Sequence, residues 1–190
     1  AIYMSLCLES AFRLYFDEIL RCERTKCYWA LLHVVAAMPD ICGALESGNG
    51  EASGNRYKDW CKRYLSNTPL SPEEWYEVRN IVLHQGRTLP RHGRYTHFTF
   101  SQPNDKGEHE HGREVGPNIL NLDVGQMAHE IWNGMTVWFY NLAAEGDSRR
   151  TRNVERNIGT LVHVSIRGKE PIPGAVMRFT PIITNTTSSP

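Results

Sequence analysis

Arg79, Asn80 and His84, in the segment RNIVLH, combine side-chain types that can cleave a phosphodiester bond without a metal ion. Histidine titrates near neutral pH and therefore suits the transfer of protons to and from oxygen atoms. Arginine carries a permanent charge on a planar group that stabilises a negatively charged phosphate. Asparagine can orient an imidazole or donate a hydrogen bond to a phosphate oxygen. We therefore treat these three as the candidate catalytic residues.

A single helix is expected to carry them. Ser71 is a favourable N-cap, Pro72 suits the first helical position, and two glutamates follow in the first turn. Gly86 then supplies a C-terminal stop. Apolar residues recur between these limits at steps of three and four: Trp75, Val78, Ile81 and Val82.

The spacing of the three polar residues on a regular helix is only partly favourable. Asn80 and His84 are four residues apart and share a face. Arg79 precedes His84 by five residues and would lie about 140° away around the axis. Its long side chain must therefore swing back for the guanidinium to approach the imidazole.

RNIVLH is similar to the signature of the HEPN superfamily of small helical proteins, an arginine, four to six residues and then a histidine. The order of the elements also resembles that family, because two long amphipathic helices precede the motif helix and another follows it. The resemblance covers residues 3–145. Some toxin-type members add a tyrosine two residues after the histidine, where this chain has Gly86.

The resemblance implies a metal-independent endoribonuclease of toxin or defence type, from a bacterial or plasmid conflict system, that cleaves RNA by 2′-hydroxyl attack. His84 would be the acid and base, Arg79 the phosphate stabiliser and Asn80 an assisting group, with no cofactor. Sites in this family form where two motif helices meet, so a homodimer is expected, and an antitoxin is a further candidate partner. Other members keep the fold without activity, so a non-catalytic module for dimerisation or for binding RNA or nucleotides is the alternative.

A cluster of basic residues follows the motif. Residues 78–104 contain four arginines and no acidic residue, although the whole chain has a formal net charge of zero. Since no global charge attracts nucleic acid, contact with RNA has to come from a local patch. The cluster, with an aromatic ring for base stacking, is the candidate RNA-binding set: Arg87, Arg91, Arg94 and Tyr95.

The same residues also have ordinary structural roles. Arg79 is placed to form an ion pair with Glu74 or Glu77, and His84 to interact with the dipole at the helix C-terminus. Exposure of His84 separates the two interpretations. An imidazole buried against Trp or Val would exclude catalysis.

Length and patterning predict a mainly α protein, a HEPN-like helical bundle with a small β hairpin and an irregular C-terminal tail. At 190 residues, the chain is long enough for one domain with a real core. We expect a helical domain over 1–145, with a β insert at about 94–120, and an extension over 146–190. Expected elements are helices over 3–23, 26–47, 57–65 and 121–144, with Pro39 kinking or splitting the second, a strand over 94–101 and another over 160–166.

Two polar segments are expected to lack regular structure. Residues 101–118 resemble a mobile loop, in which His109 and His111 make a poor metal site. Residues 146–159 are a charged connector by composition, with a phosphate-binding arm as the alternative. Five cysteines, an odd number, favour reduced thiols over disulfides or a metal centre. No apolar run approaches the ~20 residues of a membrane span, so a cytoplasmic protein is expected.

Overall fold

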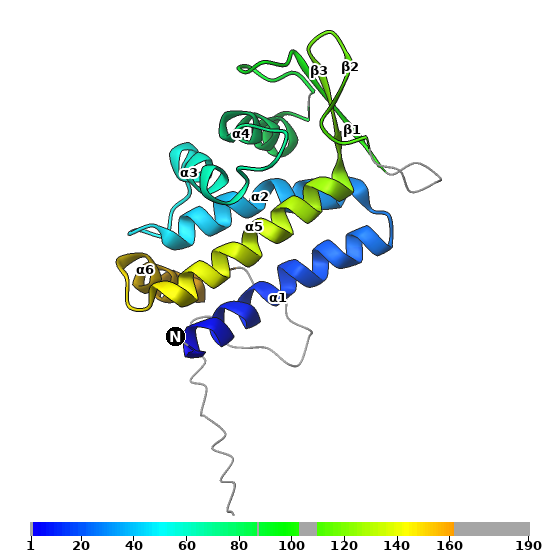
Figure 1. Ribbon diagram of the computed structural model, residues 1–190. Coiled ribbons are helices and arrows are strands. Elements are labelled where there is room, and N and C mark those ends of the chain that lie inside the picture. Colours follow the sequence, from blue (N-terminus) through cyan, green and yellow to red (C-terminus); the bar gives the residue numbers. More distant parts are fainter. Residues whose placement is uncertain (1, 87, 103–109, 162–190) are drawn as a thin grey trace, which may run out of the picture.

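The computed structural model describes residues 2–86, 88–102 and 110–161, with side chains from Phe12 onward except that of Gln85 (Figure 1). It is mainly helical, with a small mixed sheet, which confirms the predicted fold class at that level. The elements in chain order are α1 (Ile2–Arg24), α2 (Tyr28–Glu46), α3 (Gly54–Tyr64), α4 (Pro72–Asn80), the π-helical turn η1 (Ile81–Gln85), β1 (His97–Ser101), β2 (Arg113–Gly116), β3 (Ile119–Asp123), α5 (Val124–Glu145), α6 (Arg149–Asn157) and the 3₁₀ turn η2 (Ile158–Thr160).

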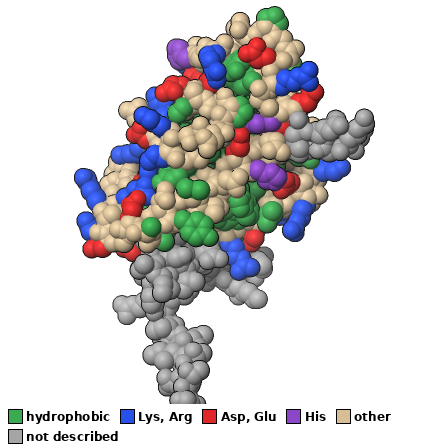
Figure 2. Space-filling view, viewed as in Figure 1, with side chains coloured by type: hydrophobic (Ala, Val, Ile, Leu, Met, Phe, Trp, Pro, Cys, Tyr) green, Lys and Arg blue, Asp and Glu red, His purple; other side chains and the backbone are tan. Residues whose placement is uncertain are grey.

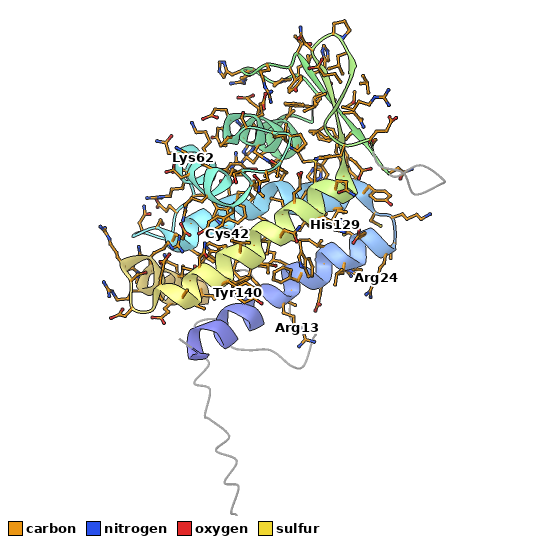
Figure 3. All side chains as sticks on the ribbon, viewed as in Figure 1. Arg13, Arg24, Cys42, Lys62, His129 and Tyr140 are labelled. Atoms are coloured by element: carbon orange, nitrogen blue, oxygen red, sulfur yellow. The ribbon has the colours of Figure 1, made fainter. Side chains whose placement is uncertain are left out.

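Three long helices, α1, α2 and α5, lie side by side and enclose the centre of the core (Figure 1). Aromatic rings join α1 to α5, where Phe12 meets Trp138 at 5.4 Å and Phe139 at 5.2 Å between ring centroids. Outward-facing positions on the same helices stay in solvent, such as Tyr140 on α5 (Figure 3). Full burial of one large apolar side chain contributes about 1.5–3 kcal/mol. The fully buried residues of the bundle include Phe12, Leu31, Val35, Met38, Ile131, Met135 and Trp138.

α2 continues through Pro39 and is not split there. A proline inside a helix removes one backbone hydrogen bond and costs about 3 kcal/mol. Packing offsets this cost, because α1, α3, α5 and α6 all contact α2. By length and composition, α2 also qualifies as a membrane span; half of it is buried in the bundle, a property that it shares with core helices of soluble proteins.

A buried tyrosine joins α2, α3 and α4. The Tyr57 hydroxyl lies 3.2 Å from the carbonyl oxygen of Ala36 and 3.3 Å from that of Trp75. α3 starts earlier than predicted, at Gly54, because Ser53 caps it by accepting a hydrogen bond from the Arg56 amide. Tyr57 thus sets how α4, the helix of the RNIVLH motif, crosses the bundle.

The segment between η1 and α5 forms a three-stranded sheet in the order β1-β3-β2. The predicted hairpin is wrong for β1, which pairs in parallel with β3; the antiparallel hairpin is β2–β3. β2 lies within the segment predicted as a loop. Parallel pairing suits the buried register, because Phe98 opposite Leu120 and Phe100 opposite Leu122 put large apolar side chains beside one another.

The segment predicted as a charged connector contains α6, which begins after the N-cap Ser148 and packs on α2. Val154 is fully buried, and the side-chain nitrogen of Asn157, Nδ2, donates to the backbone carbonyl oxygens of Leu45 and Ser47. Sequence composition missed this helix because most of its residues are polar. Thr160, predicted to start a strand, lies in η2, and residues 162–190, including the predicted tail, lie outside the described residues. The division at residue 146 stays a prediction.

Gly134 lies where α5 packs against α3, so a substitution there tests this packing. A Cβ atom there would meet Leu65 Cδ2 at 3.0 Å and both Trp60 Cη2 and the Tyr64 carbonyl oxygen at 3.2 Å. We expect Gly134→Ala to lower the free energy of unfolding by about 1 kcal/mol, because overpacking costs about 1–3 kcal/mol and outweighs the helix propensity gained. Urea denaturation followed by circular dichroism measures the change. Gly159→Ala, at a site with open space around the new Cβ, is the matched control and should change stability by less than about 0.5 kcal/mol.

Candidate functional site

α4 begins as the sequence predicts. Ser71 and Glu74 form a capping box, in which the Ser71 hydroxyl accepts from the Glu74 amide at 3.2 Å and the Glu74 carboxylate accepts from the Ser71 amide at 2.8 Å. Pro72 occupies the first turn. The reciprocal bonds satisfy two amides that a helix start leaves without partners. The helix start is therefore firmly fixed.

The end of the same helix is irregular. Residues Ile81–Gln85 form a π-helical turn, closed by a hydrogen bond of 2.7 Å from the Gly86 amide to the Ile81 carbonyl oxygen. Gly86 is left-handed, with φ 57°, a conformation that favours glycine. π turns inside helices are rare and frequent at functional sites. Five-residue hydrogen bonding makes a wider turn, which brings residues five positions apart closer in angle than a regular α-helix would.

This turn closes the gap between the two candidate catalytic residues. Arg79 Nη1 lies 2.6 Å from His84 Nε2, and it donates to the Asn80 side-chain oxygen at 3.0 Å. All three residues predicted from RNIVLH are thus in one hydrogen-bonded group. The contact needs less bending of the arginine than a regular helix would demand, because the helix itself widens.

Arg79 does form an ion pair, but its partner is Asp40 and not a residue of its own helix. Its Nε donates to Asp40 Oδ2 at 2.6 Å, and the two side chains are only 18% and 13% exposed. The predicted pairing with Glu74 or Glu77 is therefore wrong. The Arg79 guanidinium also lies 5.7 Å from the centre of the Tyr76 ring, a distance at which a cation is attracted to the ring face.

The contact with Arg79 fixes the protonation pattern of His84. A guanidinium has only donors, so Nε2 of His84 must accept and the ring proton must be on Nδ1. His84 itself is exposed and is not buried against Trp or Val. As it stands, the imidazole can donate a hydrogen bond from Nδ1, whereas Nε2 can take a proton only when Arg79 Nη1 no longer donates to it.

The predicted RNA-binding residues are only partly brought to this site. Arg94 pairs through both Nε and Nη2 with the buried Glu74 carboxylate, at 2.9 Å each, and its guanidinium lies over the Tyr95 ring. Arg91 is exposed, and its backbone amide donates to the Glu77 carboxylate at 2.9 Å. Arg87 lies outside the described residues. Glu74 and Glu77 precede the acid-free segment in the sequence, yet in the structure they lie against that segment. Their carboxylates therefore offset part of the positive charge of the segment.

Exposed basic side chains also gather away from RNIVLH. Figure 2 shows lysine and arginine side chains over α3 and α6, and Figure 3 labels Lys62 on α3. Most arginines of α6 are engaged locally: Arg150 with Glu46 and Glu145, Arg152 with Asp147, and Arg156 with the Gly48 carbonyl oxygen. This favours a structural role for them over a phosphate-binding arm.

The sequence predicts that His111 lies in a solvated loop, but the structure places it in a largely buried position. Its side chain is 11% exposed, Nδ1 accepts from the Asp123 amide at 3.1 Å, and Nε2 lies 3.2 Å from Glu130. It supports the start of α5, where Asp123 caps the Gln126 amide. His109 lies outside the described residues, and the residues that are described contain no group of three His, Cys, Asp or Glu able to hold a metal.

Buried cysteines are unsuited to chemistry. Burial raises the pKa of the Cys42 and Cys61 thiols well above the ordinary value, which keeps them protonated. Nucleophilic attack requires the thiolate. These two residues are therefore part of the core and not of a site.

Comparisons of the chain with protein-family models, with curated proteins and with solved structures found no match. The resemblance to the HEPN superfamily stays a prediction. The observations that bear on function are those at the Arg79 site itself.

Glu74 gives a test of how the basic segment is held. Burial alone would raise the pKa of Glu74, but hydrogen bonds from Arg94 and Ser71 outweigh it and lower the pKa below its ordinary value. A carboxylate with a lowered pKa in the folded state stabilises the protein above its unfolded-state pKa, and this contribution disappears as pH falls through the folded value. Glu74→Gln should thus lower the free energy of unfolding by about 1–3 kcal/mol at neutral pH.

The variant should also lose part of the acid sensitivity of the wild type, because Gln can replace Glu in the capping box but not in the ion pair. Urea denaturation at neutral pH and below about pH 4 measures both effects. Glu73→Gln, which removes an exposed carboxylate from the same turn, is the control. Equal losses of stability in both variants would contradict a role for the ion pair.

Proposed function

We propose that the protein is a metal-independent endoribonuclease. The single observation that carries this proposal is the contact of Arg79 with His84 at an exposed helix end, with Asn80 in the same group. A histidine and an arginine are the minimum set for moving protons and for stabilising a pentacovalent phosphate. Exposure of the imidazole leaves room for an RNA strand.

In the proposed reaction, the ribose 2′-oxygen attacks the adjacent phosphorus and the bond from phosphorus to the 5′-oxygen breaks. A base takes the 2′-hydroxyl proton and an acid gives a proton to the leaving 5′-oxygen. The products are a 2′,3′-cyclic phosphate and a 5′-hydroxyl. In its present state His84 carries one ring proton, so its Nδ1–H can donate a hydrogen bond but cannot be the acid. The acid has to be an imidazole that already carries both ring protons. As the base, His84 can accept a proton on Nε2 once a phosphate oxygen takes over the hydrogen bond from Arg79 Nη1, while Nε of Arg79 stays bound to Asp40.

One imidazole cannot be acid and base in the same step, so we propose a homodimer that brings two copies of His84 to one substrate. The exposed side of α2 supports this. At 100° per residue, Asp40 lies on the same arc of the helix as Trp29, His33 and Ala37. Trp29 is 66% exposed, and the other two are half-buried. A second copy on this face would therefore lie beside the Arg79 site, and two-fold dimers are the commonest assemblies.

A non-catalytic module that dimerises or binds RNA or nucleotides is the second candidate. The observation in its favour is that Asp40, Arg79, Asn80 and His84 satisfy one another. Such a group can serve purely to stabilise a helix end. RNA would then bind without being cut.

Activity gives the first test. Purified protein should cut single-stranded RNA in EDTA and leave 2′,3′-cyclic ends. His84→Ala should lose cleavage, and Arg79→Ala should lower kcat by about 10²-fold or more, the usual effect of removing one charged stabilising group. His129→Ala, an exposed histidine on α5 (Figure 3), is the matched control and should keep full activity. Cleavage retained by His84→Ala, or a folded wild type that cuts no RNA, would favour the second candidate.

Oligomeric state gives the second test. Light scattering should show a dimer at micromolar concentration, and Ala37→Arg should convert it to a monomer because a charge on an apolar interface loses its hydration. Ala144→Arg, at an exposed position near the end of α5, should stay dimeric. A wild-type monomer would exclude the shared site.

A further inference from the structure

Arg79 is held by a residue of another helix, 39 positions earlier in the chain. Its Nε meets the Asp40 carboxylate at 2.6 Å, and neither side chain is more than 18% exposed. We propose that Asp40 is the positioning residue of this site: its carboxylate orients the Arg79 guanidinium so that Nη1 faces His84 and Nη2 faces the substrate phosphate. This inference rests on the proposed ribonuclease function.

The guanidinium is planar, so fixing one edge fixes the directions of its other donors. The Asp40 carboxylate accepts from Nε, while the Asn80 side-chain oxygen and His84 Nε2 accept from Nη1. Nη2 has no hydrogen-bond partner among the described residues. It is the donor left for a phosphate oxygen, and its direction is set by the bond from the neighbouring Nε to Asp40.

Among the described residues, Asp40 is the carboxylate that pairs with Arg79, and the two buried carboxylates of α4 are engaged elsewhere. Glu74 is engaged by Arg94, and Glu77 accepts from the Arg91 amide. The remaining contact of Arg79, with the Tyr76 ring, attracts the charge but leaves the guanidinium free to turn over the ring face. Asp40 is therefore the group that removes this freedom before substrate arrives, which is where preorganised sites gain rate.

Asp40 is itself firmly placed. It follows Pro39 in α2, the helix on which the bundle packs, and the Tyr57 hydroxyl fixes α4 against the same helix one turn away, at Ala36. A partly buried ion pair adds little net stability, because desolvation of the charges offsets their attraction. Its contribution is consequently expected in the geometry of Arg79 more than in the folding of the protein.

The test compares Asp40→Asn and Asp40→Glu with the wild type. Asp17→Asn, which removes a carboxylate from an exposed ion pair on α1, is the matched control. The first measurement is the nitrogen NMR spectrum of His84 in the absence of RNA, which reports which ring nitrogen carries the proton. The second is the cleavage rate of a short single-stranded RNA, analysed as kcat and KM separately.

Wild type and Asp17→Asn should show the Nδ1–H form of His84, and Asp40→Asn should lose that preference because Arg79 no longer points at Nε2. We expect kcat of Asp40→Asn to fall by about 10- to 100-fold, in line with the effect of misplacing a reacting group by about 1 Å. KM should change by less than kcat, and Asp40→Glu should recover part of the rate. Circular dichroism should show the helical content of the wild type.

An unchanged His84 spectrum together with an unchanged kcat in Asp40→Asn would overturn the inference while leaving the ribonuclease proposal intact. A wild type that shows the Nδ1–H form but cuts no RNA would overturn the function, and the spectrum of Asp40→Asn would still decide whether Asp40 orients Arg79. If Asp40→Asn fails to fold, Asp40→Glu decides instead. It keeps the charge but displaces the carboxylate by one methylene, and wild-type spectrum and kcat in it would overturn the inference.

Discussion

The crossing of α4 over α2 is the contact on which the candidate site depends. Two polar interactions fix it, the Tyr57 hydroxyl between the Ala36 and Trp75 carbonyl oxygens and the ion pair of Asp40 with Arg79. Buried polar groups cost free energy unless they are paired, so these bonds allow few alternative arrangements of the two helices. The apolar core around them supplies the stability, and the polar contacts select the geometry.

Specific contacts also hold the charged side chains of the surface. A neutral chain has no net field with which to attract RNA, and several of its arginines are held by carboxylates close to them in space, such as Glu46, Glu74 and Asp40. The side chain of an arginine paired in this way has a fixed orientation. Its charge is partly neutralised by the carboxylate and attracts distant anions less strongly. If RNA is the substrate, as we propose, such a surface favours specific contacts with a few phosphates over broad electrostatic binding.

The π turn after α4 brings His84 within hydrogen-bonding distance of Arg79. Gly86 ends the helix in the left-handed conformation and closes the five-residue hydrogen bond to Ile81. A regular α-helical turn at this place would leave Arg79 and His84 on different faces. The irregular turn gives up regular backbone hydrogen bonding for a side-chain contact, a common arrangement at functional positions.

The sequence alone determined the long amphipathic helices, the capped start of α4, its stop at Gly86 and the trio Arg79, Asn80 and His84, because these depend on periodicity and on neighbours within a turn. Only the tertiary structure decided the partner of Arg79, the parallel pairing of β1 with β3, the folding of the polar α6 against α2 and the attachment of Arg94 to Glu74. Each of these joins residues about 20 or more positions apart, or a polar segment whose burial depends on another element. The helix and strand propensities of single residues do not include such contacts, because the contacts form only after the helices have packed.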